Sequence, residues 1–337
     1  MNNYNNKLMK EFKNKKILIS GGTGSIGLNI VRELLNYSPK AIRILSNDEH
    51  SIVEAKRKLG SNKRCIFFVG DIRDKDRLNL ALRGVDIVFH AAAMKHVDVC
   101  EENPFDAIRT NVVGTSNILE ASLLENISKF ILISTDKAVN PVSTLGASKL
   151  LAEKLTINAG KYRGTGKTIF SIVRFGNVLG SSGSVFEIFQ RKLESNEDIF
   201  VTDPNMSRFV MSIKNSVDMI LRVTSICKDG EIFILKMPSV KIETLAKEMI
   251  EFVKNSSQNK YSGTMKIGRI KTGEKINESL ITDNEIEFCH EVDGMYKITK
   301  EKNRKKISPN YFNSDSAKRI ERKLLVNMIK DCFTKKN

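Results

Sequence analysis

Three glycines at three-residue intervals, Gly21, Gly24 and Gly27, form the first chemically informative pattern in the chain. They follow a short apolar run and precede a helix-like segment that begins at Leu28. Glycines between a strand and a helix let the backbone approach a pyrophosphate, and the helix N-terminus supplies amide donors for it. We therefore predict a dinucleotide-binding loop made of Gly21, Thr23, Gly24, Ser25, Ile26 and Gly27.

Polar residues after the second apolar run are placed to meet the adenosine ribose. An acidic residue there would accept a hydrogen bond from the 2′-hydroxyl of NAD, whereas a neutral one leaves room for the 2′-phosphate of NADP. The run ends at Ser46 and Asn47, which are neither acidic nor basic. Arg43 and Lys56 would favour NADP only if they pointed inward, so the choice between NAD and NADP stays open.

The third and fourth apolar runs end in residues suited to the rest of a dinucleotide. After the third, Asp71 can accept a hydrogen bond from the adenine amino group while Ile72 packs on the ring. After the fourth, the small residues Ala91, Ala92 and Ala93 provide backbone of the kind against which a dinucleotide lies. We predict that all five contact the cofactor.

Strands and helices must alternate to position these residues. Six short runs have the length and β-branched content of strands buried on both faces, at 17–20, 42–45, 65–69, 85–90, 130–134 and 169–173. Amphipathic segments of helical length separate them, at 27–36, 52–59, 75–82, 105–125 and 146–160. The alternation predicts an α/β fold with a Rossmann-like, doubly wound parallel sheet over residues 15–180.

The alternation stops near residue 180, which predicts a different organisation for the second half. We expect residues 181–300 to form mostly a smaller, C-terminal substrate-binding cap, with the strand 231–235 joining the sheet. Helices are predicted at 186–193, 214–226 and 242–253. Residues 1–14 are expected to be a polar N-terminal extension, and residues 301–337 a charged, peripheral tail.

Composition limits the classes of protein to consider. The 337 residues are 41% hydrophobic, which is too apolar for a disordered chain. No stretch approaches the roughly 18–20 apolar residues of a membrane span, and the first fifteen residues lack the apolar core of a signal peptide. We therefore expect a soluble, cytoplasmic protein with no membrane partner.

Charge and cysteine content are the remaining compositional features. The formal net charge of +16 permits a nucleic-acid partner, an anionic small substrate or a generally basic background. The basic residues are scattered and no nucleic-acid-binding signature accompanies them, so we expect no nucleic-acid partner. The five cysteines are odd in number and widely spaced, with no CxxC, which predicts reduced thiols and no metal site.

Eight strings together carry a resemblance to a known family. They are GGTGSIG, GDIRDKDRL, HAAAMKHV, NPFDAIRTNVVGT, STDKAVNP, RFGNVLGSSGSV, TDPNMSRF and TGEK, the last followed by Glu278. In this order they resemble the extended short-chain dehydrogenase/reductases. Among these the chain is similar to the nucleoside-diphosphate-N-acetylhexosamine 4,6-dehydratases of capsule, flagellin-glycan and nonulosonic-acid biosynthesis. The resemblance spans about residues 15–285.

The resemblance implies a reaction and its partners. In that family a tightly bound, recycled NAD or NADP takes hydride from sugar C4, water is eliminated across C5 and C6, and the hydride returns to C6. The implied substrate is UDP-N-acetylglucosamine or its GDP analogue, and the product a 4-keto-6-deoxy sugar. Because helices at 105–125 and 146–160 pair across dimers in this superfamily, a homo-oligomer is expected.

The implied catalytic residues follow the fifth strand. Lys137 would remove the C5 proton if neighbours depress its pKa, and Asp136 would protonate the departing hydroxide if burial keeps it protonated. Thr135 would bond the O4 region, and Lys149 would hold the nicotinamide ribose. Leu145 stands where these enzymes generally carry a catalytic Tyr, a departure that a Met-bearing subset resembles. O4 would then be deprotonated by Lys149, through Thr135 or a water, or by the Asp136–Lys137 pair.

Further residues are expected to hold the two ligands. The resemblance implies that Asn177 contacts the diphosphate and Val178 the nicotinamide amide. It also implies that Asn111 fixes the backbone near the active site. Lys95 is placed to meet a hydroxyl or phosphate near the nicotinamide. Residues 181–185, which end in Val185, are implied as a lid over the nucleotide.

The cap is predicted to supply the remaining substrate contacts. Thr202 lies in a turn, and Arg208 is the best candidate for the diphosphate because a guanidinium meets phosphate oxygens in two-pronged fashion. Relatives carry Arg-x-Gly-Glu-Lys where this chain has Lys271 as the first residue. Lys271 keeps the positive charge but cannot make the paired hydrogen bonds of a guanidinium. The resemblance implies that Glu274 binds the ribose hydroxyls.

Three alternatives remain at this point. A C4 epimerase of the same fold would need a base at position 145 and no Asp136–Lys137 pair, and both features argue against it. A catalytically silent dinucleotide-binding homologue is supported only by Leu145. A nucleic-acid-binding protein would show a steep salt dependence of binding.

Overall fold

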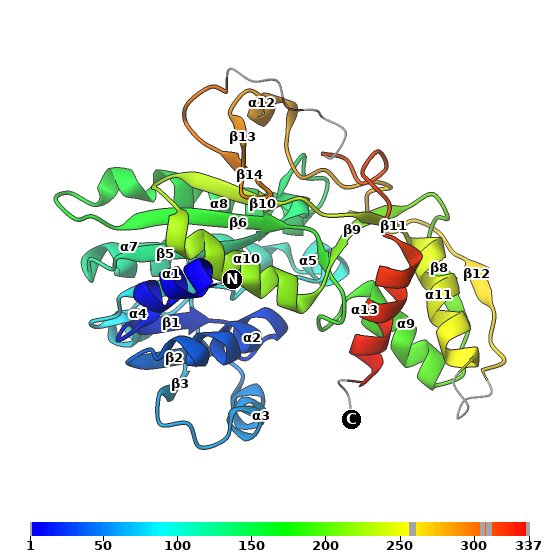
Figure 1. The fold of residues 1–337 in the computed structure, drawn as a ribbon, viewed down its shortest axis with the longest axis horizontal. Helices are drawn as coiled ribbons and strands as arrows, with labels where there is room; N and C mark the ends of the chain where they lie inside the picture. The colour runs from blue at the N-terminus through cyan, green and yellow to red at the C-terminus, as the bar shows by residue number, and fades with distance from the viewer. Residues whose placement is uncertain (1, 256–260, 304–306, 308–311, 335–337) are drawn as a thin grey trace.

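A computed structural model describes residues 2–255, 261–303, 307 and 312–334 (Figure 1). Its centre is a nine-stranded sheet in the order β13-β14-β10-β6-β5-β4-β1-β2-β3. The strands are β1 (Lys16–Ser20), β2 (Ala41–Ser46), β3 (Cys65–Val69), β4 (Ile87–His90), β5 (Lys129–Thr135), β6 (Ile169–Phe175), β10 (Glu231–Leu235), β13 (Cys289–Val292) and β14 (Met295–Ile298). Neighbouring strands pair in parallel, except that β14 is antiparallel to both of its neighbours, β10 and β13. The Rossmann-like α/β fold is confirmed.

The central strands are buried because helices pack on both faces, and their sequences are correspondingly apolar without alternation. β3 differs, since it is the edge strand, and Ile66 and Val69 are 42% and 53% exposed. The prediction that this run is buried on both faces is therefore wrong. An edge strand has a neighbour on one side only, and its apolar composition does not reveal this.

Two groups of helices flank the sheet. One contains α1 (Asn2–Phe12), α2 (Ser25–Leu34) and α10 (Ile213–Ile226), of which α1 and α10 lie in front of the sheet in Figure 1. The other contains α4 (Lys75–Leu82), α7 (Gly114–Leu124) and α8 (Thr144–Ala159), which pack in that sequence. The other elements of this half are η1 (Leu35–Tyr37), α3 (Glu49–Leu59), α5 (Val97–Glu102), α6 (Pro104–Ile108), η2 (Arg109–Val113), η3 (Asp136–Ala138) and η4 (Gly160–Tyr162).

A second, smaller core forms the part of the molecule that we call the cap, on the right in Figure 1. Its strands are β7 (Asn177–Val178), β9 (Ser207–Met211) and β11 (Ser239–Lys241) in one sheet, and β8 (Ile199–Val201) and β12 (Met265–Ile267) in another. Its helices are α9 (Val185–Glu194), α11 (Ile242–Lys254) and α13 (Arg322–Thr334). The connection after β12 returns through α12 (Asp283–Ile286) to the hairpin β13–β14, which extends the main sheet.

Both chain ends depart from expectation. The predicted polar extension 1–14 contains α1, whose Leu8 and Phe12 are buried in the main core. The tail, predicted to be peripheral, contains α13, whose Leu325 and Ile329 are buried in the cap core, where α13 packs on α11. Few apolar residues among many charges are enough to dock a helix when they fall on one face. The parts of the tail at 304–306, 308–311 and 335–337 lie outside the described residues.

If α13 is part of the cap core, Ile329→Ala will lower the free energy of unfolding by about 2–5 kcal/mol, the usual cost of deleting a buried isoleucine side chain. Leu324→Ala, on the exposed face of the same helix, serves as the control and should change it by less than about 0.5 kcal/mol. Denaturant unfolding followed by circular dichroism measures both. Equal effects of the two substitutions would mean that α13 is not packed as described.

Candidate active site

One cleft of about 1440 Å³ runs along the carboxyl ends of the parallel strands and continues against the cap. Ligands of open α/β sheets collect at this edge because the loops there diverge from a common line. Nearly all of the residues predicted from the sequence to hold cofactor or substrate line this cleft. The two that do not are Asp136, which lies buried beneath its wall, and Asn111.

The glycine loop is shaped for a close approach of backbone and ligand. Gly21 has a φ of 64°, and a Cβ there would lie 2.7 Å from the Ala92 nitrogen. A Cβ on Gly27 would lie 2.3 Å from the Gly21 carbonyl oxygen. α2 starts after Gly24, which makes no side-chain capping bond, so amide groups of its first turn remain for a ligand. These features fit a dinucleotide pyrophosphate.

The adenosine end of the cleft has its polar groups already paired. Ser46 Oγ accepts a hydrogen bond from Thr23 Oγ1 at 3.0 Å. Asp71 accepts two from the Arg73 guanidinium, at 3.0 and 2.7 Å, and one from Asn47 Nδ2 at 3.4 Å. Burial raises the pKa of the Asp71 carboxyl, but the Arg73 hydrogen bonds outweigh it and the net shift is downward. Asp71 is therefore an ionised acceptor at the position where the sequence predicts the adenosine.

The basic side chains that line this end of the cleft are not the two that the sequence analysis proposed for it. Arg43 and Lys56 do not line it, because each stacks on an aromatic ring of β3 and Arg43 also donates to the Ala81 carbonyl. Arg32, Lys58 and Arg73 do line it. Arg73 was missed, although it follows Asp71 and Ile72 in the same motif.

A buried polar chain supports the inner wall of the cleft. Thr115 Oγ1 donates to the Asn111 carbonyl, so His90 Nε2 donates to Thr115 and His90 Nδ1 accepts from Ser20 Oγ at 2.6 Å. Burial lowers the pKa of His90 to about 3, which keeps the imidazole neutral. The Asn111 side chain bonds both backbone polar groups of Met94. Asn111 thus fixes wall backbone and does not reach the cleft itself.

Asp136 and Lys137 follow β5, where the strand passes into the short turn η3. Asp136 is completely buried, and its Oδ1 accepts hydrogen bonds from Thr135 Oγ1 at 2.9 Å and Lys137 Nζ at 3.1 Å. Its Oδ2 has no hydrogen-bond partner in the described part of the chain and lies beside Gly176. Burial raises the pKa of the Asp136 carboxyl, since charge is costly in an apolar interior.

Lys137 departs from the expectation that its neighbours depress its pKa. Burial lowers the pKa of this amine, but the carboxylates of Asp136 and Glu278 raise it more, and the net shift is upward. Lys137 is therefore an ammonium group at rest. The sequence showed the adjacent Asp136 and could not show that a second carboxylate lies near.

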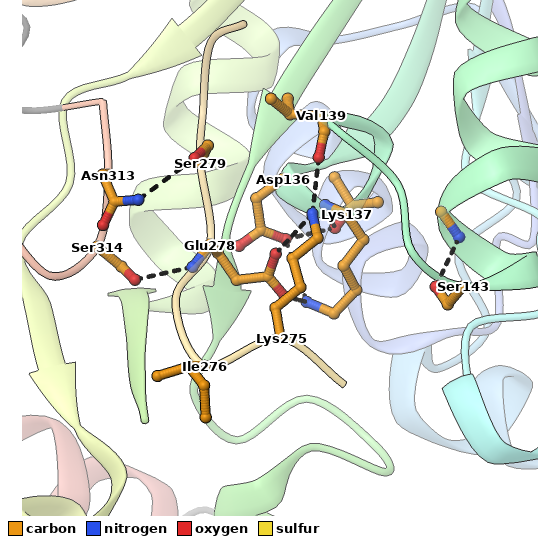
Figure 2. Close-up of polar contacts among 12 residues, drawn as sticks. Asp136, Lys137, Val139, Ser143, Lys275, Ile276, Glu278, Ser279, Asn313 and Ser314 are labelled. Carbon is orange, nitrogen blue, oxygen red and sulfur yellow. Dashed lines mark hydrogen bonds and ion pairs between the residues drawn. The ribbon is translucent and has the colours of Figure 1, made fainter. Parts of the chain in front are cut away.

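Two residues of the cap side complete this cluster, and neither was assigned a role from the sequence. Glu278 Oε1 lies 3.5 Å from Lys137 Nζ, and Glu278 Oε2 lies 3.4 Å from Lys275 Nζ. Lys275 Nζ also donates to the Val139 carbonyl at 2.7 Å. Figure 2 shows the two amines and two carboxylates converging from the β5 end and the 275–278 segment. The available signal was the string TGEK followed by Glu278.

Lys149 and Leu145 lie one turn apart on α8, on the wall of the cleft. Lys149 Nζ donates to the Ile133 carbonyl at 2.7 Å, and burial lowers the pKa of its amine to about 8. Leu145 packs with Cys100 and Ala107. α8 can approach η3 closely because a Cβ on Gly146 would lie 2.4 Å from the Lys137 carbonyl oxygen. An amine able to lose its proton near neutral pH thus stands beside an apolar side chain.

The other predicted substrate residues meet at the far side of the cleft. Lys95 Nζ donates to the Ser182 carbonyl, while the Ser182 amide donates to Ser25 Oγ, so the 181–184 loop lies over the glycine cradle. The buried Asn177 Oδ1 has no hydrogen-bond partner in the described part of the chain. Predicted residues that also line this side are Val178, Val185, Thr202, Lys271 and Glu274.

The sequence predicts that the Arg208 guanidinium binds the diphosphate, but in the structure most of its donors already have partners. Its Nη1 donates to the Ser207 and Ile276 carbonyls, and its Nη2 donates to the Lys275 carbonyl at 2.8 Å. Most of the fork is therefore engaged with backbone, although the side chain still borders the cleft. Its visible task is to hold the segment that carries Lys275 and Glu278.

The family model described as "Polysaccharide biosynthesis protein" matches residues 17–300. The chain therefore belongs to this family, and with it to the extended short-chain dehydrogenase/reductases. The X-ray structure of Pen from Bacillus thuringiensis aligns with a TM-score of 0.88 and 37% identity, covering 95% of this chain and 99% of that one. Sheet and cap are thus shared with a solved relative.

Three relatives have differing names. The chain is 46% identical to a protein of Methanocaldococcus jannaschii named an uncharacterized membrane protein, over 95% of this chain and 96% of that one. It is 40% identical to the inverting UDP-N-acetylglucosamine 4,6-dehydratase of Campylobacter jejuni, over 86% and 84%. It is 38% identical to a UDP-glucose 4-epimerase of Rickettsia felis, over 85% and 83%. Within the described ranges, this chain has no helix with the length and apolarity to cross a membrane.

The fit of the glycine loop to a dinucleotide can be tested with Gly27→Ala. The added Cβ would collide with the Gly21 carbonyl oxygen, so we expect at least a tenfold loss of affinity, as an order of magnitude, for both NADH and NADPH. Titration of the fluorescence of each reduced cofactor measures it. Gly268→Ala is the control, because its Cβ would meet no atom closer than 3.9 Å. Unchanged affinity in folded Gly27→Ala would contradict the assignment of this loop.

Proposed function

We propose that this member of the polysaccharide biosynthesis protein family is a nucleotide-sugar 4,6-dehydratase that acts on UDP-N-acetylglucosamine or its GDP analogue. The observation that carries the proposal is the contact between the buried Asp136 and Lys137 at the wall of a cleft whose other end fits a dinucleotide. One Asp136 oxygen has no hydrogen-bond partner among the residues that the structure describes. Loss of water needs one group to take a carbon-bound proton and another to give a proton to the departing oxygen. A carboxyl and an amine in contact can supply both.

The chain's own groups divide the reaction between them. A nicotinamide dinucleotide on the glycine loop would supply a hydride acceptor for C4 and later a hydride donor for C6. The ketone at C4 makes the C5 proton acidic, and Lys137 would remove it. Asp136, whose pKa is raised by burial, would hold a proton when the C6–O6 bond breaks and would give it to O6 so that water leaves. Arg208 holds the 275–278 segment against this site.

Proton removal from O4 is assigned to Lys149 in the absence of a tyrosine at position 145. Its amine has a pKa of about 8 and lies in the same cleft wall as Thr135. Near pH 8 a substantial share of the amine is therefore neutral and able to accept a proton. Thr135 or a water would relay the proton from O4, and the apolar Leu145 leaves this task to its neighbours.

A C4 epimerase is the second candidate, since relatives at 38% identity have that name. An epimerase also oxidises C4 and returns the hydride to C4, so it needs no acid for a leaving hydroxide. The buried Asp136–Lys137 pair would have no task in that reaction, and Leu145 would leave position 145 without a base. These two features favour the dehydratase.

The two reactions give distinguishable products in D₂O. With NAD or NADP and UDP- or GDP-N-acetylglucosamine, we expect a 4-keto-6-deoxy sugar whose C6 is a methyl group and whose C5 carries solvent deuterium. An epimerase would yield the C4 epimer with its CH₂OH group intact and no deuterium at C5. Proton and carbon NMR of the products tells them apart. A protein that binds the dinucleotide but converts neither sugar nucleotide would contradict both proposals.

Variants of the pair separate oxidation from elimination. Lys137→Met and Asp136→Asn should each lower product formation by at least about a hundredfold, because each removes one proton-transfer group. Absorbance of the reduced cofactor on mixing with substrate should still rise, since oxidation at C4 does not use these groups. Lys129→Met, at the opposite end of β5, is the control for a change in a buried lysine. Full product formation by Lys137→Met would refute its assignment as base.

A further inference from the structure

Glu278 is held in a fixed place by the backbone around it. It lies in the segment between β12 and α12, and its side chain is buried. Its N–H donates to Ser314 Oγ at 2.9 Å, and its carbonyl accepts from the Ser314 amide at 2.8 Å. Ser314 Oγ is in turn bonded to Ser207 of β9. A carboxylate anchored this firmly can act on its neighbours without reorganising.

The groups that face Glu278 come from three segments. Lys137 follows β5, Lys275 lies three residues before Glu278 in the same segment, and Arg208 lies on β9. Asp136 is close enough for the Glu278 carboxylate to raise the pKa of the Asp136 carboxyl. Burial alone would raise the pKa of Glu278, but the three cations outweigh it and the net shift is downward. Glu278 is therefore the ionised carboxylate of the cluster, and Asp136 the one that accepts a proton.

We propose that Glu278 is a positioning residue for the elimination: it holds Lys137 as an ammonium group at rest and directs one of its protons toward Asp136. The inference rests on the proposed function. The contacts that carry it are 3.5 Å from Lys137 Nζ to Glu278 Oε1 and 3.1 Å from the same nitrogen to Asp136 Oδ1. The Lys137 amine lies between two carboxylates. It keeps its ion pair with Glu278 and can release a proton to Asp136.

The proton count of the reaction follows from this arrangement. Transfer of one proton from Lys137 Nζ to Asp136 Oδ1 breaks an N–H bond and forms an O–H bond, giving a neutral amine and a carboxylic acid. The amine then takes the C5 proton, the C5–H electron pair forms the C5–C6 double bond, and the C6–O6 bond breaks. Asp136 gives its proton to O6, which leaves as water. Glu278 stays ionised beside Lys275 throughout.

The first test measures the charge of Lys137 in the substrate-free protein. Labelling with a trace of acetic anhydride at a series of pH values, read by mass spectrometry, gives the midpoint at which Lys137 becomes reactive. In Glu278→Gln we expect this midpoint to fall by at least about one pH unit, because an opposite charge within 4 Å has been removed. Glu287→Gln is the matched control, since Glu287 forms an exposed ion pair with Lys302. An unchanged midpoint in folded Glu278→Gln would overturn the inference.

A second variant keeps the test decisive if Glu278→Gln does not fold. Lys275→Gln leaves the Glu278 charge unshared, so the Lys137 midpoint should move upward. A downward or absent shift in folded Lys275→Gln would count against the inference. The opposite signs of the two shifts are the readout that loss of packing alone would not produce.

Activity of the same proteins separates the inference from the proposed function. With UDP-N-acetylglucosamine and cofactor, the rising limb of kcat against pH should move to lower pH in Glu278→Gln, in step with the labelling midpoint. Labelling shifts as expected without any dehydration by the unaltered protein would retain the ion-pair assignment and reject the proposed function. Dehydration without the labelling shifts would do the reverse.

Discussion

One buried cluster of charges joins the sheet to the cap at the proposed reaction site. Asp136 and Lys137 come from the end of β5, and Glu278 and Lys275 from the cap side, all largely shielded from water. Burying a charge costs several kcal/mol unless partners offset the cost, so each of the four groups needs the others in place. The cluster therefore exists only when sheet and cap are packed together. Arg208, which donates to the backbone of the 275–276 segment, maintains that packing.

The same sheet edge brings the dinucleotide cradle into line with the cluster. β1 leads into the glycine loop and β5 leads into Asp136, with β4 lying between them in the sheet. Because all three strands are parallel, their carboxyl ends open onto one cleft. The wall between the two ends is built from the residues that follow β4, which the buried chain through Thr115 and Asn111 holds in place. Hydride transfer at the dinucleotide and proton transfer at the charged cluster can thus take place in the same cleft.

Local patterns in the sequence predicted the features that depend on neighbouring residues. Strands β1 to β6 and β10, the glycine loop and the adjacency of Asp136 and Lys137 are of this kind, whereas the hairpin β13–β14 was not predicted. Features made by distant segments were missed or misjudged. Lys275 and Val139 are 136 residues apart, so no periodicity reveals their hydrogen bond. The pKa of Lys137 is raised by the adjacent Asp136 and also by Glu278, whose approach the sequence does not reveal. Likewise the sequence of α13 predicts a charged tail, because the cap surface that buries Ile329 comes from distant segments.

The central claim is that the buried pair faces C5 and C6 of a sugar. A crystal structure of the protein with its dinucleotide and an unreactive UDP-sugar analogue tests this directly. We expect Lys137 Nζ to lie about 3–3.5 Å from C5 and an Asp136 oxygen to reach O6 within hydrogen-bond distance. A sugar bound with C6 turned away from both groups, or a ligand that leaves the cluster untouched, would contradict it.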